Sequence, residues 1–272
     1  MDDKITTYKA NTDVTSYQTP TTMMDEAKQG RVVLVVGSEF GCGKTVFMCG
    51  VAGALRELGF RTRVFKPLII GGRKQSEDEV SFLATVGQTP VNYPVTFLEG
   101  PLSIKETNWQ NSVLMTRSPD QLTFVEMPGG AASPVCFEEN SVGTMTNTWR
   151  DSADLANEFI QPCIVVAKHQ IDAIERLVMT CAYLQHKGLV VIATATVETE
   201  PNGGAELEKR RTRADFSIGL NSKTGVPFLG CIKNSSSVSV PRVTQGNLIK
   251  QTESGLDLLP LLKAINLTMP TG

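Results

Sequence analysis

The sequence predicts an α/β protein with a single doubly wound, mostly parallel sheet and helices on both faces. Short apolar, β-branched runs alternate with longer helix-like segments along the chain, which is the pattern of βαβ units. A glycine-rich turn at residues 37–45 follows the first apolar run and precedes the first helical segment. This strand–loop–helix context is the one that a phosphate-binding loop requires.

The elements follow in order along the chain. Strands are expected at residues 32–36, 62–65, 122–126, 163–167, 189–194 and 227–232. They are almost wholly apolar, as expected of parallel strands that helices cover on both faces. Helices are expected at residues 44–58, 77–86, 152–158, 171–186 and 256–265, with a weaker helix at 205–213. We find no repeat and no linker, so residues 29–272 are expected to form one P-loop NTPase-like domain.

Residues 1–28 are rich in Thr, Asp, Tyr and Lys and lack helical or strand periodicity. They are expected to form a mobile N-terminal arm, or an arm that packs on a partner subunit.

Composition narrows the functional classes. The chain has 272 residues, of which 41% are hydrophobic, so it can bury a full core without disulfides. Its net charge of −2 gives no reason to expect nucleic-acid binding. The six cysteines have no CxxC spacing, which argues against zinc and suits reduced core residues of a cytoplasmic protein. No run is long and apolar enough to cross a membrane, and the first residues lack a signal-peptide pattern.

The turn at residues 37–45 carries most of the functional information. Ser38, Gly43, Lys44 and Thr45 fit the phosphate-loop pattern, except that the first glycine is shifted by one residue. Backbone N–H groups of such a loop, and the helix after it, attract phosphate oxygens. Lys44 is expected to reach the β- and γ-phosphates, and Thr45 to bind Mg²⁺. The rest of the loop is expected to line the nucleotide: Glu39, Phe40, Gly41 and Cys42. The alternative is an ordinary glycine-rich turn.

Charged residues follow two of the predicted strands, at the sheet edge where ligands of such folds bind. Lys66 follows the strand at 62–65 and precedes a proline that stiffens the exit. It is expected to hold a phosphate or an anionic intermediate; otherwise it is a solvated surface lysine. Glu126 closes the strand at 122–126 and is expected to bind Mg²⁺; otherwise it is a turn or cap residue.

Four further residues have a predicted place. Gly129 and Gly130 let the backbone pass close to the nucleotide. Asp78 lies at the start of a predicted helix, where it either complements the helix dipole or gives the metal another carboxylate. His169 is interpreted as a surface or capping residue; the alternative is a catalytic residue.

The order of these segments resembles the dethiobiotin synthetases, which are ATP-dependent cyclo-ligases of biotin synthesis. The similarity extends over roughly residues 31–265 and is carried by residues 37–45, 64–67, 125–130 with Pro134, 164–168 and 227–232. The resemblance implies that ATP, Mg²⁺ and CO₂ are used to close a ureido ring on 7,8-diaminopelargonic acid through a phosphorylated carbamate.

The resemblance also implies roles for single residues. It assigns Lys44 to the phosphates, Lys66 to the carbamate and γ-phosphate, and the metal to Thr45, Asp78 and Glu126. It implies a homodimer with the diamine bound near the subunit interface. Substrate contacts are expected at Ile70, Pro128 and Asp172, the last at a helix start that receives the substrate carboxylate from the partner subunit.

The chain departs from the family pattern on the substrate side. Phe40 and Gly41 stand where the family usually has a threonine and an acidic residue, and Ile70 stands where it has a serine. The adenine-contacting asparagine falls near Ala195, so the base preference stays open. Two alternatives therefore remain: an amide-synthase-type ligase acting on another acceptor, or a nucleotide-sensing protein in which Phe40 and Ile70 fill the acceptor pocket.

Overall fold

The computed structural model describes residues 31–71, 73–87, 96–98, 121–139, 145–205, 209, 213–235 and 245–268. The predicted arm at residues 1–28 lies outside this range.

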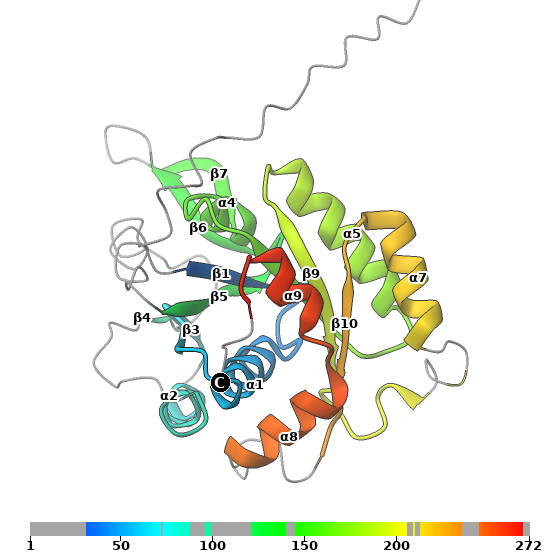
Figure 1. Ribbon diagram of the computed structural model, residues 1–272. Helices are drawn as coiled ribbons and strands as arrows, with labels where there is room; N and C mark the ends of the chain where they lie inside the picture. The colour runs from blue at the N-terminus through cyan, green and yellow to red at the C-terminus, as the bar shows by residue number, and fades with distance from the viewer. Residues whose placement is uncertain are drawn as a thin grey trace, which may run out of the picture.

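A six-stranded sheet forms the centre of the protein, with the strand order β10-β9-β8-β1-β5-β2. Each neighbouring pair of strands in it is parallel, which confirms the predicted fold class (Figure 1). The strands are β1 (Arg31–Gly37), β2 (Thr62–Phe65), β5 (Leu122–Gly130), β8 (Cys163–Lys168), β9 (Val191–Val197) and β10 (Phe228–Ile232).

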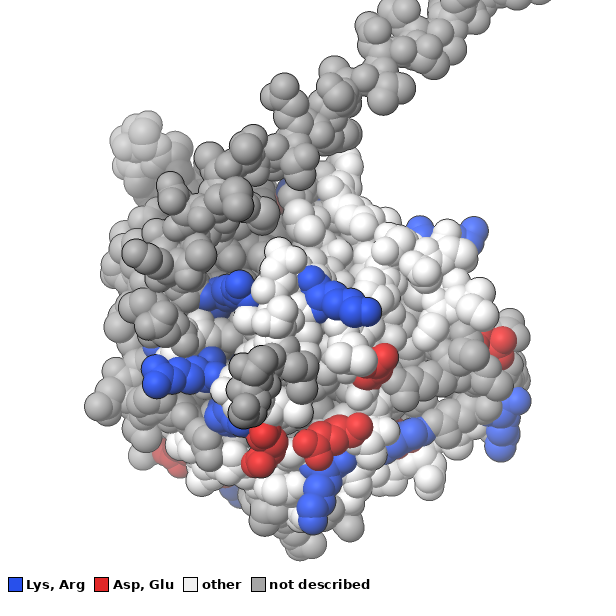
Figure 2. All heavy atoms as spheres, in the orientation of Figure 1, with Lys and Arg blue, Asp and Glu red and all other residues white. Residues whose placement is uncertain are grey.

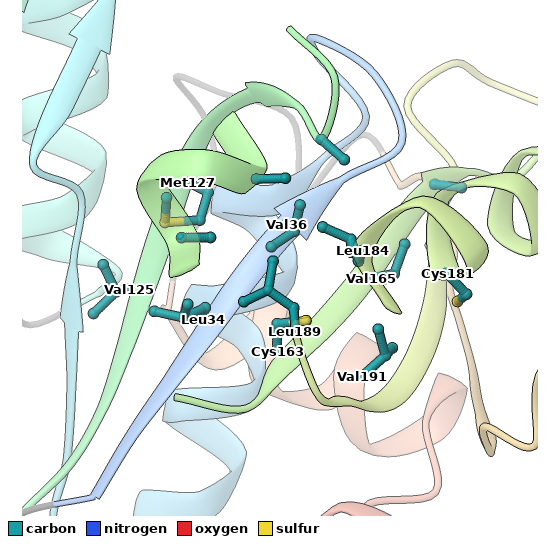
Figure 3. Packing of buried hydrophobic residues seen from close by; sticks show 14 of the residues in the cluster. Leu34, Val36, Val125, Met127, Cys163, Val165, Cys181, Leu184, Leu189 and Val191 are labelled. Atoms are coloured by element: carbon teal, nitrogen blue, oxygen red, sulfur yellow. The ribbon is translucent and has the colours of Figure 1, made fainter. Parts of the chain in front are cut away.

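Helices cover both faces of this sheet. They are α1 (Lys44–Glu57), α2 (Arg73–Thr85), α4 (Ser152–Asn157), α5 (Ala173–His186), α7 (Arg213–Thr224), α8 (Gln245–Gly255) and α9 (Leu259–Ala264). Because side chains alternate along a strand, Val33 and Val35 of β1 pack with α1, α2, α8 and α9 on one face. Leu34 and Val36 pack with α4, α5 and α7 on the other. Figure 3 shows this second cluster, in which Leu34 lies near residues of β5 and β8.

Several elements differ from the prediction. β5 continues to Gly130, so Glu126 lies inside the strand and does not close it. β9 runs from Val191 to Val197 and thus begins and ends later than expected. α2 begins at Arg73 and α9 at Leu259, while the predicted helix at 205–213 lies largely outside the described residues.

Some elements carry too short or too polar a pattern to be predicted. α7 and α8 have many polar residues and few apolar ones in sequence. Outside the main sheet, β3 (Leu68–Ile70) pairs with β4 (Thr96–Leu98), and β6 (Pro134–Glu139) forms an antiparallel pair with β7 (Met145–Asp151). These short pairs depend on tertiary placement more than on local periodicity.

The surface carries both signs of charge. Figure 2 shows basic and acidic side chains mixed over the described residues of one face, in line with the net charge of −2. Within the described part of the chain, the helices are too short or too polar to span a bilayer.

Candidate functional site

The glycine-rich loop curls at the carboxyl end of β1. Gly41 and Gly43 have φ angles of 68° and 91°, in the left-handed region that favours glycine. A Cβ atom at Gly43 would lie 2.6 Å from Cγ1 of Val197 on β9, so a side chain has no room there. Gly43 is also the N-cap of α1 and offers no side chain to the first-turn N–H groups. Those groups stay available to an anion.

A pocket of about 240 Å³ opens beside this loop. That volume lies below the roughly 300–1,000 Å³ usual for whole drug-sized ligands, so it suits the phosphate and metal end of a nucleotide. Its lining comes from the loop, the start of α1, the residue after β2, and from β3, α2 and β5. The lining residues are Phe40, Gly41, Cys42, Gly43, Lys44, Thr45, Val46, Lys66, Leu68, Ile70, Glu79, Glu126, Pro128 and Gly129. Five of the sequence-predicted residues are not part of it: Ser38, Glu39, Asp78, Gly130 and Asp172.

Lys66 lies at the centre of the polar side of the pocket. Its Nζ is 2.9 Å from Oε1 of Glu126 and donates to Oγ1 of Thr45 at 3.1 Å. It also pairs with the Glu79 carboxylate. Burial by itself would lower the pKa of Lys66, but Glu126 and Glu79 outweigh it and raise the pKa. Lys66 therefore remains an ammonium in a site where it is 8% exposed.

Lys44 connects the loop to the end of β5. Its Nζ donates to the carbonyl oxygen of Gly129 at 2.7 Å, and the residue is 5% exposed. Gly129 has a φ of 63°, and a Cβ at Gly130 would lie 2.8 Å from Cα of Glu39. The two glycines thus let β5 pass close to the loop. Their place beside a nucleotide stays a prediction.

The acidic residue of α2 that lies at the pocket is Glu79, and not Asp78 as predicted. Asp78 is exposed, whereas Oε1 of Glu79 lies 3.2 Å from Oγ1 of Thr45. α2 begins four residues earlier than predicted, so both acids lie in its second turn and not at its start. Glu79 precedes Phe82 and Leu83, which are buried, at the spacing that places residues on one helix face. That spacing was the signal that could have identified Glu79.

The oxygens around Lys66 form a set that fits Mg²⁺. Thr45 donates to Oε2 of Glu126 at 2.7 Å, and Glu79 completes a group of one hydroxyl and two carboxylates. Mg²⁺ is commonly held by one or two carboxylates together with waters and substrate phosphates. Within the described ranges, no three His, Cys, Asp or Glu residues gather as a closed cage. The site therefore suits a metal shared with a phosphate ligand.

Other loop residues fall into two groups. The Oγ atom of Ser38 is buried and has no hydrogen-bond partner among the described residues, so it can serve a ligand. Cys42 donates its thiol to the Val166 carbonyl at 3.3 Å, and burial raises the pKa of this thiol. Cys42 thus acts as a packing residue.

Part of the pocket lining is apolar. Phe40 is 58% exposed at the tip of the loop. Ile70 is half-buried on β3, and Pro128 is buried on β5. These residues supply contact area but no side-chain hydrogen bonds to an acceptor.

Two residues of the connection between β8 and α5 can be compared with the sequence interpretation. His169 is buried, and its Nδ1 lies 2.9 Å from Oγ1 of Thr196, so reading it as a surface residue was wrong. Burial and, to a smaller extent, the charge of Lys233 lower the pKa of His169 to about 4, although the charge of Glu198 opposes this shift. Asp172 is the N-cap of α5 and pairs with Arg176, whose guanidinium also contacts Glu39. The sequence analysis missed Arg176 altogether.

Comparison with known proteins places this geometry in a family. A family model described as an AAA domain matches residues 31–242. The chain belongs to this AAA domain family. Curated relatives include the ATP-dependent dethiobiotin synthetase BioD of Bacillus cereus (strain B4264), 27% identical over 217 residues, or 73% of this chain and 81% of that protein. The corresponding synthetase of Geobacillus sp. (strain WCH70) is 28% identical over 179 residues, or 60% and 71%.

Solved structures similar to this AAA domain protein include cell-division proteins. The septum site-determining protein MinD complexed with Mg-ADP from Pyrococcus horikoshii OT3 has a TM-score of 0.48 and 12% identity, covering 87% of this chain and 94% of that one. The MinC:MinD complex of Aquifex aeolicus also gives 0.48 and 12%, covering 89% and 98%. The family match and the distant synthetase relatives support the resemblance predicted from the sequence at the level of the family.

Proposed function

We propose that this protein is an ATP- and Mg²⁺-dependent carbon–nitrogen cyclo-ligase of the dethiobiotin synthetase type. One observation carries the proposal: Lys44, Thr45, Lys66 and Glu126 meet, with Glu79, in one pocket under a phosphate loop. The names of the distant relatives, which are ATP-dependent dethiobiotin synthetases, support the choice of reaction.

The proposed reaction has three steps. CO₂ adds to one amine of 7,8-diaminopelargonic acid, giving a carbamate and releasing a proton. A carbamate oxygen then attacks the γ-phosphorus of ATP, and ADP leaves. The second amine attacks the carbamoyl carbon and loses a proton, phosphate leaves, and the ureido ring closes. The second step brings two anions together, so positive charge at this point lowers the barrier.

The two lysines take different parts in this scheme. Lys44 and the loop N–H groups hold the β- and γ-phosphates, as the position of Lys44 at the start of α1 supports. Lys66 stabilises the carbamate and the transferring phosphoryl group. Because Lys66 is buried beside two carboxylates, it carries its charge throughout the physiological pH range.

Thr45, Glu126 and Glu79 are the residues that would hold Mg²⁺, which neutralises phosphate charge when bound. The Lys66 ammonium lies among these same oxygens. Two cations repel, so the ammonium and a divalent ion compete for that position.

A related ligase that acts on another acceptor is the second candidate. The apolar wall of Phe40, Ile70 and Pro128 favours it, because this wall has no side chain that hydrogen-bonds an amine. The homodimer, and the contact of Asp172 with a substrate in the partner subunit, are further proposals that rest on the resemblance alone.

Phosphate release tests the proposed function. The purified protein receives ATP, Mg²⁺ and bicarbonate, with and without 7,8-diaminopelargonic acid, and the product is identified by mass. We expect phosphate release that depends on the diamine, together with dethiobiotin. ATP turnover that is indifferent to the diamine would favour the second candidate. Tight nucleotide binding without turnover would favour a nucleotide sensor.

A further inference from the structure

An ion bridge joins the phosphate loop to the helix after β8. Arg176 of α5 lies with its Nη1 2.5 Å from Oε2 of Glu39, although 137 residues separate the two. Its Nε lies 2.6 Å from Oδ2 of Asp172, one turn earlier on the same helix. One guanidinium therefore holds a loop carboxylate and a carboxylate at the start of α5.

The bridge stands at the point where ligands of such folds bind. β1 and β8 are adjacent parallel strands. From β1 the chain first builds β2 and β5 on one side, and then β8, β9 and β10 on the other. The strand order thus reverses between β1 and β8, and the crevice at such a reversal is the usual ligand site.

Glu39 places a carboxylate within the loop that is proposed to bind phosphate. The proposed function requires the loop to hold a triphosphate, and a carboxylate within the loop repels it. Oε1 of Glu39 is buried and has no hydrogen-bond partner among the described residues. Oε2 is the atom that contacts Arg176. The Arg176 guanidinium thus offsets the charge of Glu39 and turns its carboxylate toward α5.

We propose that Arg176 is a positioning residue for the nucleoside triphosphate, which neutralises and orients Glu39 and does not itself touch the nucleotide. The inference rests on the proposed nucleotide site. Arg176 is not among the residues that line the pocket within the described chain, which agrees with an indirect role. Arg176 has 36% of its side chain exposed, so its replacement should leave the core intact.

A double-mutant cycle tests the inference. The affinity of the full chain for ATP with Mg²⁺ is measured by calorimetry for the wild type, Arg176→Met, Glu39→Gln and the double variant. We expect Arg176→Met to weaken ATP binding about 10-fold, within the range of coupling between contacting residues. Glu39→Gln should restore most of that loss in the double variant, because the repelling charge is gone. Arg176→Lys should lose less than Arg176→Met.

Lys187→Met is the matched control. Lys187 directly follows α5 and pairs with Asp154 at 2.6 Å, away from the loop. This variant should bind ATP as the wild type does, and melting temperatures verify the fold of each variant. If Arg176→Met melts early, Glu39→Gln alone remains decisive, since it should bind ATP at least as tightly as the wild type.

The outcomes separate the two claims. Wild-type binding with no loss in Arg176→Met would overturn the inference and leave the proposed function intact. A loss that Glu39→Gln does not restore would also overturn it, because Arg176 would then act on the ligand or on the fold. A wild-type protein that binds no ATP would overturn the proposed function, and this inference with it.

Discussion

The two sides of the pocket differ in chemistry. On the phosphate side, Lys44, Thr45, Lys66 and Glu126 are linked by contacts of 2.7 to 3.1 Å to one another or to the backbone. On the acceptor side, the wall consists of Phe40 and other apolar residues, and Phe40 is 58% exposed. Burying the charged groups of the phosphate side costs free energy, which indicates that they serve to bind a ligand. Under the proposed function, the charged side would determine the class of reaction and the apolar side the acceptor.

Removing the loop lysine should have the largest effect on ATP binding and turnover. Lys44→Ala deletes a charge-assisted phosphate contact of about 1.5–3 kcal/mol, so ATP affinity should fall roughly 10- to 100-fold. The loss in kcat/KM should be larger, because charge develops on the phosphoryl group in the transition state. Calorimetry and steady-state kinetics measure the two quantities. A Lys44→Ala variant with near-normal kinetics would show that the phosphate side has no role in turnover.

Two neighbouring acids offer a matched comparison on the phosphate side. Glu79→Gln should raise the Mg²⁺ concentration needed for half-maximal turnover by about 10- to 100-fold, because changes around metal sites commonly reduce metal affinity by this factor. Asp78→Asn should have little effect, since Asp78 is exposed. Titration of turnover with Mg²⁺ compares the variants. Equal losses would mean that the inward position of Glu79 is irrelevant to the metal.

The proposed competition between the Lys66 ammonium and Mg²⁺ can be measured by thermal unfolding, without an activity assay. Lys66→Met leaves Glu79 and Glu126 without their cation, so the variant should be less stable than the wild type by about 3–5 kcal/mol. Added Mg²⁺ should then raise its melting temperature more than that of the wild type, because the metal binds the vacated oxygens. A Mg²⁺ effect no larger than in the wild type would contradict the competition.

The smallest effects are expected on the acceptor side. Phe40→Thr and Ile70→Ser introduce residue types that the resembling family uses there. They should change KM for the diamine by several-fold and leave ATP affinity within about 2-fold, since neither side chain carries a charge. Kinetics with each substrate varied in turn would decide. A loss of ATP affinity as large as the change in KM for the diamine would contradict the proposal that the two sides of the pocket have separate roles.

Local patterns account for what the sequence could predict. The strands of the main sheet have short apolar runs, and Lys44 and Thr45 lie in a motif of fixed spacing. Lys66 could be predicted because it follows the end of β2, at the edge of the sheet where ligands bind. Glu126 was chosen as a strand end, which was wrong, because β5 continues to Gly130. Glu79 was missed because the helix was expected to begin at residue 77, which made the neighbouring acids a helix start, whereas α2 begins at Arg73 and Glu79 lies in its second turn.

Tertiary contacts account for the rest. Glu39 and Arg176 lie 137 residues apart, and neither has a local pattern that points to the other. The β6–β7 pair and the buried contact of His169 with Thr196 likewise arise only when distant segments pack. Contacts between distant segments leave no periodic pattern in the sequence, whereas an amphipathic helix or strand does.

Coupling between Mg²⁺ and nucleotide is the most direct test of the account. The affinity for ATP is measured by calorimetry with Mg²⁺ and with a chelator, for the wild type and for the nearly isosteric Thr45→Val. We expect Mg²⁺ to tighten ATP binding by at least about 10-fold in the wild type and by much less in Thr45→Val, because one hydroxyl ligand is lost. ATP binding that ignores Mg²⁺, or that keeps its full coupling in Thr45→Val, would contradict the proposed site.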